Sequence, residues 1–87
     1  MASIEAVKAA LIQAAGQGEA TLGQIRSAID NTEQMIARIN AVTAGTGHPK
    51  ITESIARLER SKQHLTEAAA SLQIGRQAAR EYVSLLG

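Results

Sequence analysis

The chain has 87 residues, of which 45% are hydrophobic, yet it contains no Phe, no Trp and a single Tyr. This length accommodates one domain and excludes a second independent core. Nine basic and eight acidic residues give a formal net charge of +1, so no strong field of one sign attracts nucleic acid or acidic lipid. The absence of cysteine excludes disulfides, thiol nucleophiles and zinc–thiolate sites.

The apolar content is carried by Ala, Ile, Leu and Val, and no segment alternates in the manner of a strand. We therefore predict an all-α fold in one domain that spans residues 1–87. No run approaches the roughly 18 apolar residues of a membrane span. Glu5 interrupts the apolar N-terminus and no basic region precedes it, which argues against a secretory signal peptide. We expect a cytoplasmic protein whose export, if it occurs, is leaderless.

The first predicted helix spans about residues 4–42. Ser3 is a suitable N-cap, because its side-chain oxygen can accept a hydrogen bond from the first helical turn. Apolar or small residues then recur at alternating spacings of three and four, which is the pattern of a helix stripe. This stripe consists of Ile4, Val7, Leu11, Ala15, Gly18, Leu22, Ile25, Ile29, Thr32, Ile36 and Ile39.

A loop over about residues 43–48 separates this helix from a second one over about residues 49–85. Gly45 suits a left-handed cap after the first helix, and Pro49 is preset for the first turn of the next helix. The second helix has a stripe of its own. It consists of Ile51, Ile55, Leu58, Lys62, Leu65, Ala69, Leu72, Arg76, Ala79, Val83 and Leu86.

The two stripes predict an antiparallel hairpin with one register. A short loop makes neighbouring helices antiparallel, so facing residues should have numbers with a constant sum. That sum is 94 for Ile36 with Leu58, and it recurs at six other apolar layers. The predicted seam contains Leu11, Leu22, Ile25, Ile29, Ile36, Ile39, Ile55, Leu58, Leu65, Leu72 and Val83.

Two layers of this register place a long basic side chain in the seam. Lys62 faces Thr32, and Arg76 faces Gly18. Each can run its methylene groups along the seam and carry its charge to the edge.

Four glycines lie inside the predicted helices, and each costs about 1 kcal/mol relative to Ala. They are Gly16, Gly18, Gly23 and Gly75. One interpretation is that Gly18 and Gly75 form a notch where another backbone approaches closely. The other is a break of the first helix near residues 16–18. The sequence leaves both open.

Catalytic constellations are not recognisable in the sequence. The two histidines, His48 and His64, are separated by about four helical turns, so they cannot share a metal ion. The carboxylates alternate with basic residues, as in exposed helix pairs. The turn at residues 45–47 lacks the strand and the Gly-Lys-Ser/Thr ending of a phosphate loop. We predict a protein that is not an enzyme and has no catalytic residues, cofactor, metal or small-molecule substrate.

Nucleic-acid binding is a less favoured alternative, because the basic patch is modest and stacking aromatics are absent. The patch consists of Lys50, Arg57, Arg60 and Lys62.

A partner is implied by apolar residues that flank the stripes. An Ala-rich seam buries little apolar area, and flanks of this kind are typical of helices that contact two neighbours. The flanks are Val7, Ala14, Ala28, Met35 and Val42 on the first helix, and Ile74, Ala78 and Leu85 on the second. We predict that two hairpins pair into a four-helix bundle. The predicted interchain surface contains Met35, Val42, Ile74 and Leu85, together with the glycines Gly18 and Gly75.

A helical hairpin of this length, with a glycine-bearing turn and a seam of small aliphatics, resembles the WXG100 or ESAT-6-like proteins of actinobacteria. The resemblance covers the whole chain. It implies that two hairpins pair as a four-helix bundle and that the assembly travels through type VII secretion. The family's central Trp-x-Gly is absent, with Gly45-Thr46-Gly47 at the turn. Its C-terminal Tyr-x-x-x-Asp/Glu signal is incomplete, because Tyr82 is followed by Leu86 at the acidic position.

Two functional readings follow. In the first, the chain is a helical interaction module that serves as a WXG100-like companion or adaptor for a secreted partner. In the second, it is a small structural homo-oligomer with no link to secretion. The expected partner is accordingly either a second copy or another helical protein.

Overall fold

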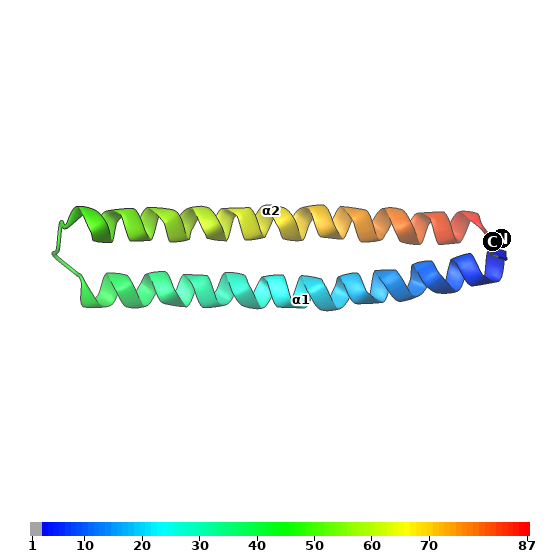
Figure 1. The fold of residues 1–87 in the computed structure, drawn as a ribbon, viewed down its shortest axis with the longest axis horizontal. Coiled ribbons are helices and arrows are strands. Elements are labelled where there is room, and N and C mark those ends of the chain that lie inside the picture. Colours follow the sequence, from blue (N-terminus) through cyan, green and yellow to red (C-terminus); the bar gives the residue numbers. More distant parts are fainter. Residues whose placement is uncertain (1–2) are drawn as a thin grey trace.

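The protein folds as two long antiparallel helices joined at one end by a short loop (Figure 1). The computed structural model describes residues 3–87. Helix α1 spans Ile4–Val42 and helix α2 spans Pro49–Leu85. The molecule measures 63 × 19 × 14 Å, and the start of α1 and the end of α2 lie at the end opposite the loop. The all-α hairpin predicted from the sequence is therefore confirmed.

The helix ends follow local rules. The Ser3 side chain accepts a hydrogen bond from the Ala6 backbone N–H at 3.1 Å and so caps α1. Gly45 has a φ of +82°, the left-handed conformation that only glycine adopts without strain. His48 caps α2, because its Nδ1 accepts a hydrogen bond from the Lys50 backbone N–H at 3.0 Å.

The capping contact gives His48 a structural role at the start of α2. Replacing His48 by Ala should lower the free energy of unfolding by about 0.5–1 kcal/mol, because an N–H of the first turn loses its partner. Replacing it by Ser or Asp should restore most of that loss. Thermal or urea unfolding of the three variants measures the effect. A variant His48→Ala as stable as the native chain would show that the cap contributes nothing.

Helix α1 is continuous through the glycines at residues 16–18, so the alternative of a broken first helix does not apply. The reason is packing. Ala15, Gly18 and Leu22 are all buried against α2, and this contact holds the backbone in place across the weak segment.

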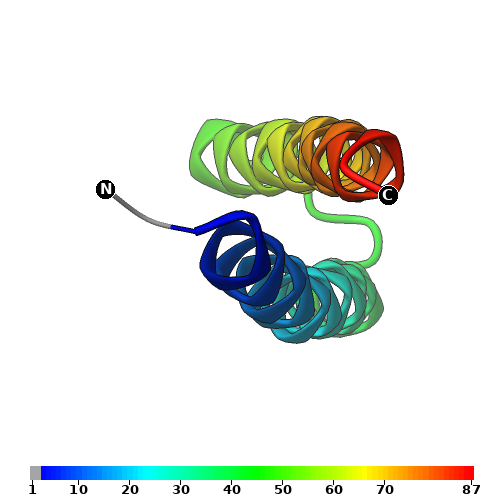
Figure 2. The same cartoon turned by 90° about the vertical axis from the view of Figure 1, so that its right-hand side faces the viewer.

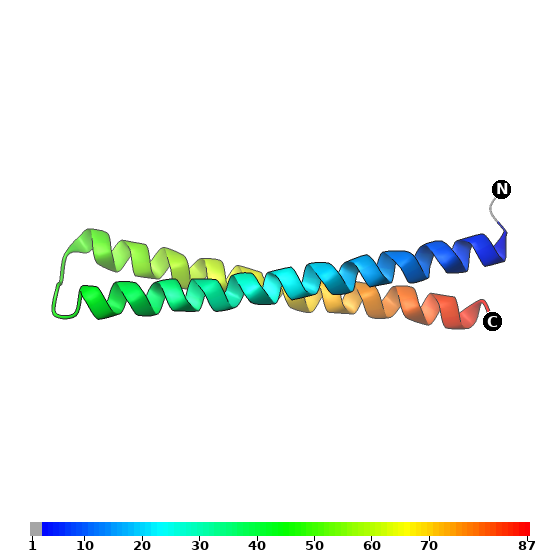
Figure 3. The ribbon, with the colours of Figure 1, turned by 90° about the horizontal axis from the view of Figure 1, so that it is seen from below.

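The core is a single seam between the helices. Its most buried side chains are Ala15, Leu22 and Ile36, which are 4–7% exposed, and no side chain in residues 3–87 is fully buried. Every residue of the predicted α2 stripe is half-buried, and so is every remaining residue of the α1 stripe except Gly18, which is buried, and Ile4. Ile4 is 59% exposed, because the register places its facing position beyond residue 87. The helices coil gently around each other along this seam (Figures 2 and 3).

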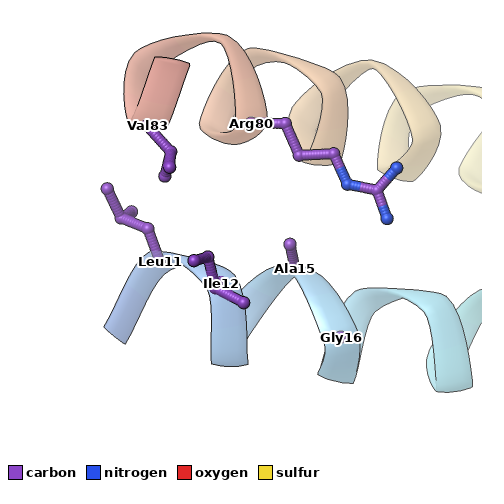
Figure 4. Close-up of a pocket in the computed structure, with 6 residues that line it drawn as sticks. All are labelled: Leu11, Ile12, Ala15, Gly16, Arg80 and Val83. Atoms are coloured by element: carbon purple, nitrogen blue, oxygen red, sulfur yellow. The ribbon is translucent and has the colours of Figure 1, made fainter. Parts of the chain in front are cut away.

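The predicted register is visible where side chains of the two helices meet. A Cβ built on Gly18 would lie 2.8 Å from Cγ of Arg76, so these two residues face each other directly. Leu11 and Val83 point toward one another near the termini (Figure 4). Both pairs have the numbering that the sequence analysis requires.

Candidate interaction surface

The hairpin has two long sides, and they differ in charge. On one side lie helical residues spaced by seven, which directly follow every second seam position beginning with Ile4 and Ile51, and we call this side the ion-pair face. Six of its eleven residues are charged. The ion-pair face consists of Glu5, Ile12, Glu19, Arg26, Glu33 and Asn40 of α1, and Thr52, Glu59, Thr66, Gln73 and Arg80 of α2.

Arg76 crosses the seam and reaches this face. Its Cγ and Cδ lie over Gly18, and its Nε donates to the Ala15 carbonyl oxygen at 3.1 Å. Its Nη1 donates to Gln73 at 3.0 Å, and its Nη2 lies 3.6 Å from Glu19. The Arg76 side chain is only 9% exposed. The glycine therefore makes room for a nearly buried arginine of the same chain.

Lys62 occupies the equivalent place nearer the loop. Its Nζ lies 3.3 Å from Glu59 on its own helix and 4.0 Å from Glu33 on α1. Its side chain is 31% exposed, so the charge sits at the edge of the seam. Both basic seam residues carry their charge to the edge of the seam, as predicted from their long stems, and there both pair with carboxylates of one face.

The opposite side consists of residues spaced by seven along each helix, most of which directly precede the remaining seam positions, and we call it the uncharged face. None of its eleven residues carries a charge. They are Val7, Ala14, Thr21, Ala28, Met35 and Val42 of α1, and Ser54, Ser61, Ala68, Gly75 and Tyr82 of α2. Most are exposed, with Val7, Ala28 and Ser54 half-buried.

A shallow groove crosses the uncharged face in its terminal half, and we call it the Gly75 groove. Its lining is almost wholly apolar and comes from both helices, with Ala14 and Gly18 on one side and Ser71, Gly75 and Ala79 on the other. No atom lies within 4 Å of a Cβ built on Gly75. The space over Gly18 is already filled by Arg76. Of the two glycines proposed as a notch, only Gly75 therefore faces free space.

Large apolar side chains stand exposed on or beside the uncharged face. Met35 is 48% exposed and Val42 is 83% exposed near the loop, and Leu85 is 84% exposed near the termini. Tyr82, which the sequence analysis did not include in the interchain surface, belongs to the same face and is 50% exposed. Tyr82 follows Gly75 by seven residues, and this spacing in the sequence is the signal that could have assigned Tyr82 to the same face. Ile74 is 72% exposed but lies on the outer side of α2, away from this face.

A second hollow opens on the ion-pair face near the termini (Figure 4). Leu11, Ile12 and Val83 form its apolar wall, and the Arg80 guanidinium borders it. The charge of Arg80 at this hollow has no ion pair among the described residues, whereas the guanidinium of Arg76 beside the Gly75 groove is engaged by Ala15, Gln73 and Glu19. The uncharged face is therefore the better candidate for contact with another protein.

Within residues 3–87 no group of three His, Asp or Glu side chains is arranged to hold a metal ion. Neither helix contains a stretch that is long and apolar enough to cross a membrane, as far as the chain is described. No family model, curated protein or solved structure matches this chain.

Proposed function

We propose that this chain is a helix-binding module that packs its uncharged face against a second helical hairpin to build a four-helix bundle. The observation that carries the proposal is the segregation of charge between the two sides. The eleven residues of the uncharged face, spaced by seven along the two helices, include no charged residue. Such depletion of charge is typical of the core of an interface and is not required of a surface that stays in water.

Surface area supports the same conclusion. A compact monomer of 9.1 kDa exposes roughly 4,900 Å², whereas this hairpin exposes 6345 Å². The excess of roughly 1,400 Å² on one chain is larger than the roughly 800 Å² that each partner loses in a standard protein–protein interface. Among the residues that the structure describes, the seam buries three apolar side chains, which leaves the apolar flanks without cover.

The shape of the face favours a helix as the partner. Ala, Ser and Gly at Ala14, Ser61, Ala68 and Gly75 allow a neighbouring backbone to approach closely, and exposed Met35 provides a flexible side chain to fill a gap. Four-helix bundles are assembled from such pairs of antiparallel helices.

The resemblance to WXG100 proteins supports a more specific form of this proposal. There the hairpin acts in the cytoplasm as a companion or adaptor that binds its helical partner before leaderless export by type VII secretion. A structural homo-oligomer uses the same face without any role in export.

The proposal predicts that folding and association are coupled. Raising the concentration of the purified full chain from about 1 to 100 μM should raise its melting temperature and shift its sedimentation from monomer to dimer, because only the assembly covers the uncharged face. If a partner chain is required, adding it should have the same effect. A chain that melts cooperatively as a monomer at every concentration, with or without a helical partner, would contradict the proposal.

A further inference from the structure

We infer that the uncharged face binds a second copy of this chain in antiparallel orientation, with Met35 of each copy inserted into the Gly75 groove of the other. This inference rests on the proposed function and specifies its partner and geometry.

The position of the groove matches the position of Met35. Ile25 lies near the middle of the long dimension of the hairpin. If a two-fold axis relates two antiparallel copies at the level of Ile25, the copies therefore overlap along almost their whole length. Met35 follows Ile25 by ten residues, and Ala15 precedes it by ten. Met35 of one copy therefore lies over the part of the other copy where Ala14, Gly18 and Gly75 form the groove.

The other large residues also find space in this arrangement. Tyr82 is at the level of residue 12 of α1, because the register pairs numbers that sum to 94. The axis carries it to the level of Ser54 on the second copy, a small residue of the same face. Val42 is carried to the neighbourhood of Val7 of the second copy. Each exposed apolar residue thus meets a small or apolar one.

Charge selects the antiparallel orientation over the parallel one. Residues spaced by seven from Ser71 border the uncharged face, as Ser71 shows by lining the groove. In the loop half the charged residues at such border positions are Arg38 on α1, and Lys50 and Arg57 on α2. A parallel pair would place Arg38 of each copy at the level of Arg57 of the other, and do so twice.

The antiparallel pair avoids this repulsion. It carries Arg38 to the level of Ala10 and Gln17 of the second copy, where the border is uncharged. Glu53 lies 3.5 Å from Arg57 and offsets part of its charge, but both side chains are exposed, so this ion pair is weak. Among the described residues Arg38 has no ion pair that would offset its charge.

Single cysteines can report the orientation, because the native chain has none. Ala68 lies at the level of residue 26 of α1, beside the proposed axis. In the antiparallel pair Ala68 meets Ala68 of the second copy, so the variant Ala68→Cys should form a disulfide-linked dimer under mild oxidation. In a parallel pair Ala68 meets Ala28 instead, so only a mixture of Ala28→Cys and Ala68→Cys chains would cross-link efficiently.

A second experiment tests the groove by adding one methyl group. Gly75→Ala fits the isolated hairpin and improves helix propensity, but it fills the groove that Met35 is proposed to enter. We expect its dimer dissociation constant to rise at least tenfold by sedimentation equilibrium. Gly23→Ala is the matched control, because Gly23 is helical, exposed and free of neighbours but lies off the uncharged face. Its dissociation constant should stay within about threefold.

The outcomes separate the inference from the proposed function. Cross-linking of the mixed Ala28→Cys and Ala68→Cys chains alone, or unchanged dimerisation of Gly75→Ala, would overturn the antiparallel arrangement while the helix-binding function stands. A native chain that is monomeric by itself but forms a bundle with another protein would overturn the second copy as the partner. A stable monomer with no helical partner would overturn both.

Discussion

Replacing Met35 by Asp is expected to dissociate the assembly and to lower its helicity at the same time. Met35 lies on the uncharged face and is 48% exposed in the single chain, so association would bury it. A carboxylate there must lose water without gaining a partner, which typically costs about 2–5 kcal/mol per site. A loss of about 3 kcal/mol raises a dissociation constant more than 100-fold. Sedimentation and circular dichroism at low micromolar concentration measure both effects.

Ile12→Asp is the matched control for this variant. Ile12 is also an aliphatic residue on α1 and is 61% exposed, but it belongs to the ion-pair face. Both variants introduce Asp into α1 and so carry the same loss of helix propensity. The difference between their dissociation constants therefore reports the contribution of the uncharged face to association. Ile12→Asp should leave the dissociation constant within a few-fold of the native value. Equal effects of the two substitutions would mean that the uncharged face has no special role in association.

The second large effect is expected at Arg76, where substitution by Glu should remove a large fraction of the protein's free energy of unfolding. The Arg76 side chain is 9% exposed and donates to the Ala15 carbonyl oxygen, so a carboxylate there faces an acceptor and Glu19 at close range. Placing an unpaired charge in such a site costs about 3–5 kcal/mol. Small domains have only about 5–15 kcal/mol of stability in total.

Two further variants separate the contributions of Arg76. Arg76→Met keeps an apolar stem over Gly18 but loses the hydrogen bonds, so the free energy of unfolding should fall by only about 1–2 kcal/mol. The ion pair itself contributes little to this loss, because Glu19 is 72% exposed. Arg80→Glu, one turn further along the same helix at an exposed site, should change stability by less than about 0.5 kcal/mol. Urea unfolding at one protein concentration compares all three, and an Arg76→Glu protein as stable as Arg80→Glu would contradict this account.

Much of the fold was predictable because the chain follows local rules without exception at its helix ends. Ser3, Gly45 and Pro49 mark the boundaries by capping and by backbone preference, and the structure begins and ends its helices where those rules place them. The register was predictable for a different reason. Side chains three and four residues apart share one face, so the two stripes could match along their whole length in only one alignment.

The candidate surface was predictable only in part. The sequence analysis selected Met35, Val42 and Gly75, which share the uncharged face, but it grouped Ile74 with them and left out Tyr82. Exposed apolar residues can be recognised from a sequence. Which side of a coiled hairpin each one occupies follows only when both helices are placed against each other.

The sequence by itself determined the helices, the loop and the pairing of the two stripes, because these depend on interactions between residues close in the chain and on one repeating period. The tertiary structure decided where Arg76 and Lys62 direct their charges, and so which side of the hairpin is neutralised and which is left apolar. Long side chains have several rotamers of similar energy. One rotamer of each side chain is selected only when the opposite helix brings carboxylates and a carbonyl oxygen within reach of its charge.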